Sequence, residues 1–138
     1  VQPDGPACNS GNRGSLEQFA SINGLRRLCD RDPRELSAEA DAGDPEALEV
    51  WSRYGERLGC GVASLVYVFT PQLVLLGGGL AGAARHFLPA VRREVESRVQ
   101  AVSREGLRIE AACLGNGAGR LGAARLALQR LNGMMAPD

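Results

Sequence analysis

Residues 70–80 read TPQLVLLGGGL, and this stretch decides the fold class. Leu73 to Leu76 is a short, fully apolar run, which is typical of a buried strand. Three glycines follow it directly and end the strand abruptly. A strand that leads through a glycine-rich turn into a helical pattern indicates an α/β fold.

The segments on either side of this strand predict helices and one more strand. Asp44-Pro45 is a good helix start, because Asp caps well and Pro suits the first turn, and apolar residues then recur with a period near 3.6 to about Phe69. Further along the chain, we expect a helix at 83–102, a strand at 107–114, a glycine turn at 115–119 and a last helix at 123–131. This order predicts parallel strands joined by helical crossovers.

Three features precede or border the long helix. Residues 1–15 are crowded with Gly, Pro, Asn and Ser, so we expect an irregular loop. A helix should begin after Ser15, with an interruption at Asn23-Gly24. The acidic stretches 30–32 and 41–44 are interpreted as solvated surface.

The composition is that of an ordinary soluble domain. Of 138 residues, 44% are apolar and 23% charged, and 16 basic residues balance 16 acidic ones. Without a concentration of positive charge, direct nucleic-acid binding by this segment is not expected. The longest apolar run, residues 62–69, is far shorter than the roughly 20 residues that span a bilayer, so no membrane association is expected. Scattered cysteines and the lack of a signal peptide predict a cytoplasmic protein with free thiols.

Two glycine-rich loops are candidates for ligand binding. Residues 77–80 leave bare amides at the carboxyl end of a strand, where open α/β sheets bind ligands. Residues 115–122 follow the second strand, and loops after adjacent parallel strands lie at one edge of the sheet. Taken alone, such glycines more often form a turn that binds nothing. The first loop is not a P-loop, because the chain has no Lys, and its spacing does not match a dinucleotide fingerprint.

Three segments together resemble the C-terminal half of the ROK family, which joins bacterial repressors, open reading frames and kinases. In the family's order they are CNSGNRGSLEQFAS at 8–21, TPQLVLLGGGL at 70–80 and LGNGAGRLGAA at 114–124. The resemblance implies an α/β fold that forms the C-terminal lobe of an actin- and hexokinase-like (ribonuclease H-like) ATPase. Residues 1–138 would be that lobe, with 1–15 a loop resembling a degenerate zinc motif and 16–138 the α/β part.

The first segment departs from the family at its zinc motif. The chain keeps Cys8 and Glu17 but has Ser10 and Ser15 where the family has zinc-binding cysteines. Structural zinc needs four soft or borderline ligands, and His86, the single histidine, lies in the helix after the glycine loop. Neither zinc nor another metal site is therefore expected in this chain. The serines resemble those of a subgroup of ROK sugar kinases, which favours a kinase over a repressor.

The resemblance implies ligand contacts for two parts of the chain. Glu17 would bind the substrate by accepting hydrogen bonds from sugar hydroxyls, and Gly77, Gly78, Gly79 and Leu80 would face the adenosine of ATP. A carboxylate can accept two hydroxyl donors at once, and bare backbone lets a purine lie flat. Without the family, Glu17 is more simply a first-turn carboxylate favoured by the helix dipole.

The leading hypothesis is a lobe of an ATP-dependent hexose kinase, similar to glucokinase, which would use ATP with Mg²⁺ in the intact protein. The family's phosphate motif and catalytic Asp come before a segment like this one, and neither is found here. We therefore expect no catalytic residue in this chain and no phosphoryl transfer by it alone.

Two alternatives stay open at this point. One is the effector domain of a ROK-family sugar-responsive transcriptional regulator. The other is a standalone interaction domain that dimerises through an exposed sheet edge and the long helix. A homodimer is expected for the family as well, so dimerisation alone would not separate these hypotheses.

Overall fold

The computed structural model describes residues 2–134 and confirms the α/β class. Strands β1 (Leu73–Leu76) and β2 (Arg108–Ala111) pair in parallel, with Leu73 opposite Arg108. Helix α4 (Ala84–Arg98) forms the crossover that parallel pairing requires. The bounds of the first strand are confirmed residue for residue, but the expectation that it is buried is wrong, because Leu73 and Leu75 are exposed at the unpaired edge of the two-stranded sheet that residues 2–134 form. The second strand is shorter than predicted.

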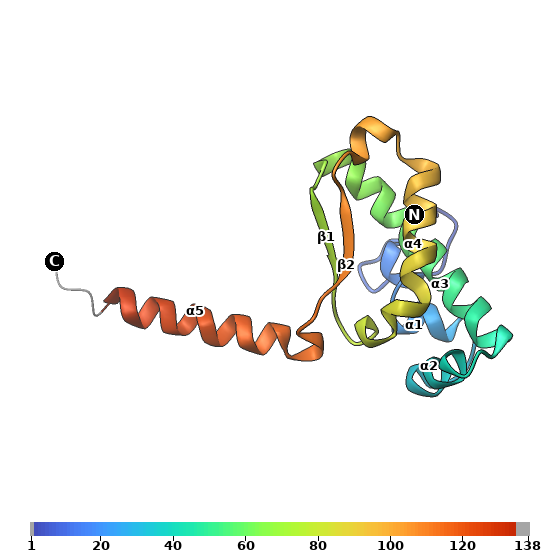
Figure 1. Cartoon of the computed structure of the whole chain (residues 1–138), viewed down its shortest axis with the longest axis horizontal. Helices are drawn as coiled ribbons and strands as arrows, with labels where there is room; N and C mark the ends of the chain where they lie inside the picture. The colour runs from blue at the N-terminus through green and yellow to red at the C-terminus, as the bar shows by residue number, and fades with distance from the viewer. Residues whose placement is uncertain (1, 135–138) are drawn as a thin grey trace.

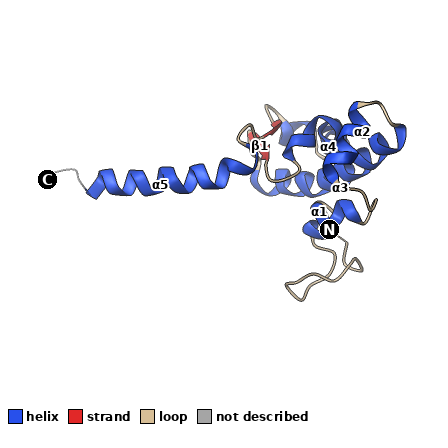
Figure 2. Ribbon diagram, turned by 90° about the horizontal axis from the view of Figure 1, so that it is seen from below, coloured by secondary structure: helices blue, strands red, loops and turns tan. Residues whose placement is uncertain are grey.

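Most of the helical structure lies to one side of this small sheet. The other elements are α1 (Ile22–Arg26), α2 (Pro33–Asp41), α3 (Pro45–Phe69) and α5 (Ala118–Met134), with 3₁₀ turns η1 (Leu16–Gln18), η2 (Ala81–Ala83), η3 (Ala101–Arg104) and η4 (Gly115–Gly117). Figure 1 shows α3 and α4 beside the strands, with α1 and α2 at their lower end. Helix α5 extends away from this body in both Figure 1 and Figure 2. None of the helices in the described part of the chain is both long and apolar enough to cross a membrane.

Helices α2 and α3 begin with the same signal. Asp32 and Asp44 each precede a proline, and each carboxylate accepts a hydrogen bond from a first-turn N–H at 2.8 Å. The predicted bounds of α3 are confirmed. Helix α2 was not predicted from the sequence. The interpretation of these acidic residues as solvated surface holds for Asp30, Asp32 and Asp41, which are exposed, and Asp32 and Asp44 also cap helices.

The first predicted helix is broken earlier than expected. Helix α1 starts afresh at Ser21, whose hydroxyl accepts a hydrogen bond from the N–H of Gly24 at 3.2 Å. A Cβ on Gly24 would lie 2.9 Å from the Cα of Phe19 and closer still to its carbonyl. Glycine thus lets α1 fold back tightly on the turn before it. The Asn23-Gly24 pair lies inside α1, and the predicted interruption there is wrong.

The two later helices are confirmed with shifted ends. Helix α4 ends at Arg98 rather than near residue 102, because the backbone becomes extended at Val99. Helix α5 starts at Ala118 rather than residue 123, because the glycines before it form a 3₁₀ turn that leads directly into the helix.

The core lies between α3 and α4. The rings of Trp51 and Phe87 are 5.8 Å apart, and Tyr54 packs edge-on against them at 5.9 and 5.2 Å. The helices approach closely at Gly55, where an added Cβ would lie 2.8 Å from the Cβ of Ala90. This close packing gives the sheet a rigid support on one face.

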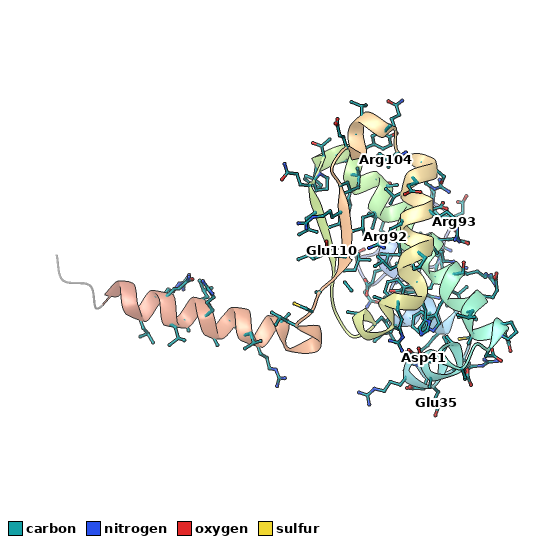
Figure 3. The ribbon with its side chains drawn as sticks, in the orientation of Figure 1. Glu35, Asp41, Arg92, Arg93, Arg104 and Glu110 are labelled. Atoms are coloured by element: carbon teal, nitrogen blue, oxygen red, sulfur yellow. The ribbon has the colours of Figure 1, made fainter. Side chains whose placement is uncertain are left out.

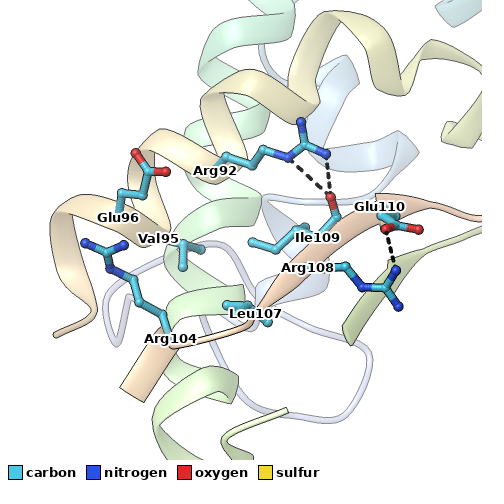
Figure 4. A pocket seen from close by; sticks show the side chains of 8 residues that line it. All are labelled: Arg92, Val95, Glu96, Arg104, Leu107, Arg108, Ile109 and Glu110. Carbon is cyan, nitrogen blue, oxygen red and sulfur yellow. Dashed lines mark hydrogen bonds and ion pairs between the residues drawn. The ribbon is translucent and has the colours of Figure 1, made fainter. Parts of the chain in front are cut away.

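The two edges of the sheet differ. At the outer edge of β2, the guanidinium of Arg92 donates two hydrogen bonds to the carbonyl of Ile109, at 2.7 and 3.2 Å (Figure 4). Arg92 lines a hollow of about 290 Å³ together with Arg104 and Glu110, and Figure 3 shows these three near β2. Within residues 2–134 no strand pairs with the other edge of β1, where the side chain of Leu75 is 57% exposed. The edge at β1 is therefore the one that could accept a further strand.

Candidate functional site

The structure brings Glu17 and the glycine loop into one cavity. Glu17 lies in η1, whereas Gly77 and Gly79 follow β1, yet all three line a hollow of about 320 Å³. The rest of the lining comes from Ala20, Ser21, Ile22, Asn23, Tyr54 and Leu80. The residue predicted to contact sugar and the loop predicted to face adenosine thus meet at one place.

The glycine loop is shaped by one left-handed residue. Gly78 has a φ of 98°, which favours glycine, and its carbonyl accepts a hydrogen bond from Ala81 at 3.1 Å. A Cβ on Gly79 would meet nothing closer than Ile22, at 3.7 Å, so packing does not require glycine there. Gly78 is the one predicted loop residue outside the cavity lining. Its role is to turn the chain so that Gly77 and Gly79 expose their backbone.

Glu17 is exposed and available to a ligand. Within residues 2–134 its carboxylate has no hydrogen-bond or ion-pair partner. The segment after it is fixed, because the hydroxyl of Tyr54 donates to the carbonyl of Ala20 at 3.2 Å. Burial raises the pKa of Tyr54 to about 12, so this hydroxyl keeps its proton at neutral pH. A free carboxylate on a fixed backbone can accept two hydroxyl donors from one ligand.

Sequence reasoning missed part of this site. Tyr54 and Ile22 line the cavity, but an aromatic residue in a long helix and an isoleucine after a serine give no signal of their own. Their contribution depends on how α1 and α3 pack. Ser21 does lie in the first segment that resembles the ROK family, so a signal was present for that residue.

A second cavity adjoins the glycine loop. It has a volume of about 340 Å³ and shares Gly79 and Leu80 with the first. Its wall includes Arg85. The Nε of Arg85 donates to Asp41 at 2.7 Å, and its Nη2 donates to the hydroxyl of Ser37 at 3.2 Å. The hydrogen bond from Arg85 holds the pKa of Asp41 below its usual range. This ion pair links α2 to α4 beside the loop; Figure 3 labels Asp41 at that position.

The second glycine loop starts beside the first, as predicted. The N–H of Ala112 donates to the carbonyl of Leu76 at 2.9 Å, so the two strands end side by side. Gly115 then turns the chain into η4 with a φ of 50°. The cavity beside Glu17 takes its lining from the first loop.

The zinc-motif positions also converge. The Sγ of Cys8 lies 3.0 Å from the Oγ of Ser15, and hydrogen bonds from Ser15 and Ser10 lower the pKa of Cys8 to about 7. One thiol with two hydroxyls does not fit zinc, which takes cysteine, histidine or carboxylate ligands. His86 lies in α4 with its Nε2 3.2 Å from Asp41. In the described part of the chain, no group of three His, Cys, Asp or Glu side chains is arranged to hold a metal.

Cys8 should be the most reactive of the four free cysteines. Its lowered pKa makes half of the thiol a nucleophilic thiolate near pH 7, whereas burial raises the pKa of Cys60. Iodoacetamide labelling over a pH series, read by peptide mass spectrometry, should give a midpoint near pH 7 for Cys8. Ser15→Ala removes the strongest hydrogen bond and should move that midpoint upward. The same midpoint in Ser15→Ala would show that the hydroxyl does not stabilise the thiolate.

Relatives with known names include both kinases and repressors. The glucokinase of Thermotoga maritima is 29% identical and aligns with 96% of this chain and 48% of its own length. The xylose repressor of Bacillus subtilis is 28% identical and aligns with 96% of this chain and 36% of its own length. The chain thus spans about half or less of the length of these relatives.

A solved structure and a family model agree with this similarity. The ROK family glucokinase from Streptomyces griseus, in complex with glucose and AMPPNP, superposes with a TM-score of 0.82 and 28% identity. The match covers 94% of this chain and 49% of that one, and it confirms the predicted actin-like ATPase fold. The ROK family model matches residues 1–130. Because the ROK family model matches nearly the full length of this chain, and because the chain has the fold of a ROK family structure, this chain belongs to the ROK family.

Proposed function

We propose that residues 1–138 form the C-terminal lobe of an ATP-dependent hexose kinase similar to glucokinase. In it, Glu17 contacts the sugar and residues 77–80 face the adenosine of ATP. The observation that carries this proposal is the cavity shared by Glu17, Gly77 and Gly79. Phosphoryl transfer requires the two substrates to be held within reach of each other, and one shared cavity suits that need. The Streptomyces griseus glucokinase, with its glucose and AMPPNP, supports the choice of ligands.

The chemistry of the chain is that of binding rather than of reaction. The carboxylate of Glu17 accepts two sugar hydroxyls, and a sugar with one hydroxyl inverted would leave an acceptor unpaired. The purine lies on the backbone of residues 77–80, with the second cavity next to Gly79 as room for the rest of the nucleoside. The base that takes the hydroxyl proton, and the groups that hold the phosphates with Mg²⁺, belong to a preceding lobe in this proposal. The chain alone should then bind both ligands without forming ADP.

A sugar-responsive regulator is the second candidate, and the xylose repressor favours it, since it aligns with as much of this chain as the glucokinase does. A regulator needs the sugar contact but no nucleotide. Calorimetric titration of the chain with glucose, xylose and AMPPNP separates the two, because a kinase lobe should bind glucose and AMPPNP, whereas a regulator lobe should bind one of the sugars but not AMPPNP. Sugar-dependent release of DNA by the intact protein would then establish the regulator. Failure to bind AMPPNP and both sugars would reject both proposals for this lobe.

Gly79→Ala tests the part played by the glycine loop. The fold should tolerate the methyl group, since nothing lies closer than Ile22 at 3.7 Å. The methyl would project toward the cavity that Ile22 also lines. We expect an unchanged melting temperature and an AMPPNP affinity lower by about tenfold, which corresponds to roughly 1.4 kcal/mol. Gly117→Ala, in the second loop with nothing within 4 Å, is the matched control. Equal affinity in Gly79→Ala and the unaltered chain would contradict the adenosine contact.

A further inference from the structure

Glu17 depends on its neighbours for its position. It lies in η1, a single 3₁₀ turn of three residues, and so short a turn has little regular structure to hold it in place. Its carboxylate has no partner among residues 2–134, so its own side chain does not fix the turn. The direction of Glu17 must therefore be set by contacts to the residues beside it.

The residue after Glu17 is held by one guanidinium group. Nη1 of Arg27 donates to the main-chain oxygen of Gln18 at 2.7 Å, and Nη2 donates to the side-chain Oε1 of Gln18, also at 2.7 Å. Gln18 is buried, with 7% of its surface exposed. Because a guanidinium is planar and rigid, these two bonds fix the backbone and the side chain of Gln18 together.

Contacts further along the chain hold the other end of the same segment. The N–H of Ala20 donates to the carbonyl of Leu16 at 2.8 Å, which closes the turn around Glu17. The carbonyl of Ala20 accepts from Tyr54 on α3. Arg27 thus acts on the residue adjacent to Glu17, and Tyr54 acts beyond it.

We propose that Arg27 is a positioning residue for Glu17. Its two hydrogen bonds to Gln18 hold the η1 turn so that Glu17 lines the cavity shared with Gly77 and Gly79. The inference rests on the proposed sugar contact of Glu17. Arg27 itself is outside the lining of that cavity. It would influence sugar binding only through the turn.

The first test compares two adjacent arginines in the 138-residue chain. Arg27→Gln should weaken glucose binding by about tenfold, because the turn that carries Glu17 loses two hydrogen bonds from a charged donor and must then be ordered when the sugar binds. Arg27→Lys keeps the charge but not the planar pair of donors, so its loss should be intermediate. Arg26→Gln is the matched control, because Arg26 is exposed and has no hydrogen-bond or ion-pair partner among residues 2–134. An unchanged glucose Kd in Arg27→Gln would overturn the proposal.

A double-mutant cycle separates positioning from a general loss of stability. If Arg27 acts through Glu17, Arg27→Gln should change the glucose Kd by less than about twofold when Glu17→Gln is already present. NMR chemical-shift titration can follow the weak binding of these variants. An equal loss in both backgrounds would mean that Arg27 supports the fold in general, and would overturn the positioning role.

Amide hydrogen exchange tests, without any ligand, whether the hydrogen bonds from Arg27 to Gln18 stabilise the turn. The amides of Phe19 and Ala20 donate to the carbonyl of Leu16 at 3.0 and 2.8 Å. They should exchange about tenfold faster in Arg27→Gln than in the unaltered chain, in keeping with local opening of the turn. Unchanged exchange would overturn the proposal. If the unaltered chain binds no glucose but exchange is still faster in Arg27→Gln, the proposed sugar contact of Glu17 is wrong, whereas the stabilisation of the turn by Arg27 is supported.

Discussion

Glu17→Gln should weaken glucose binding by the chain by about 10- to 100-fold. A hydrogen bond to a charged group contributes about 1.5–3 kcal/mol, and each 1.4 kcal/mol corresponds to a factor of ten in Kd. The amide of Gln offers one acceptor oxygen in place of two, so one sugar hydroxyl loses its partner. Isothermal titration calorimetry with glucose measures the change. The melting temperature should stay the same, because the carboxylate has no partner in residues 2–134 to lose.

Glu35→Gln is the matched control for this substitution. Glu35 is also an exposed first-turn carboxylate, on α2, and it lies at the lower end of the molecule in Figure 3. Both variants remove one negative charge from a helix start. If the helix dipole were the whole role of Glu17, both would leave glucose binding unchanged and lower stability slightly. A glucose Kd in Glu17→Gln equal to that in Glu35→Gln would reject the sugar contact.

The strong local signals predicted most of the secondary structure. Strand β1 and helix α3 followed from an apolar run and from an Asp-Pro start, which are signals contained in a few neighbouring residues. Asp32-Pro33 carries the same start signal, so α2 was also within reach of the sequence. The break before Ser21 was not, because it depends on Gly24 packing against the backbone of Phe19.

The site was predictable only in part for a similar reason. Parallel pairing of β1 and β2 places both glycine loops at one edge, and that follows from the order of the elements. The meeting of Glu17 with Gly77 could be expected only from the resemblance to the ROK family, because no local pattern joins residues so far apart. The hydrogen bonds from Arg27 to Gln18 are likewise tertiary contacts, formed because α1 folds back over the turn before it.

Gly55→Ala should destabilise the fold by about 2 kcal/mol or more, although alanine favours helices. A Cβ at this position would lie 2.8 Å from the Cβ of Ala90 and closer still to the carbonyl oxygen of Phe87. A backbone oxygen cannot move aside as the end of a flexible side chain can, so α3 and α4 would have to separate. Overpacking of this kind costs about 1–3 kcal/mol, occasionally more. Urea denaturation followed by the fluorescence of Trp51, the single tryptophan, measures the loss.

Gly122→Ala shows how much of the effect comes from packing. Gly122 is also a helical glycine, in α5, and nothing lies within 4 Å of an added Cβ. Alanine gains roughly 1 kcal/mol over glycine in a helix interior, so this variant should be neutral or slightly stabilised. Gly55→Ala carries the same gain, and any loss it shows must therefore exceed that gain. If Gly55→Ala unfolded at the same urea concentration as the unaltered chain, α3 and α4 would not be in the close contact that packs Trp51 against Tyr54. Because Tyr54 also lines the cavity beside Glu17, that part of the cavity would then be less rigid than the structure indicates.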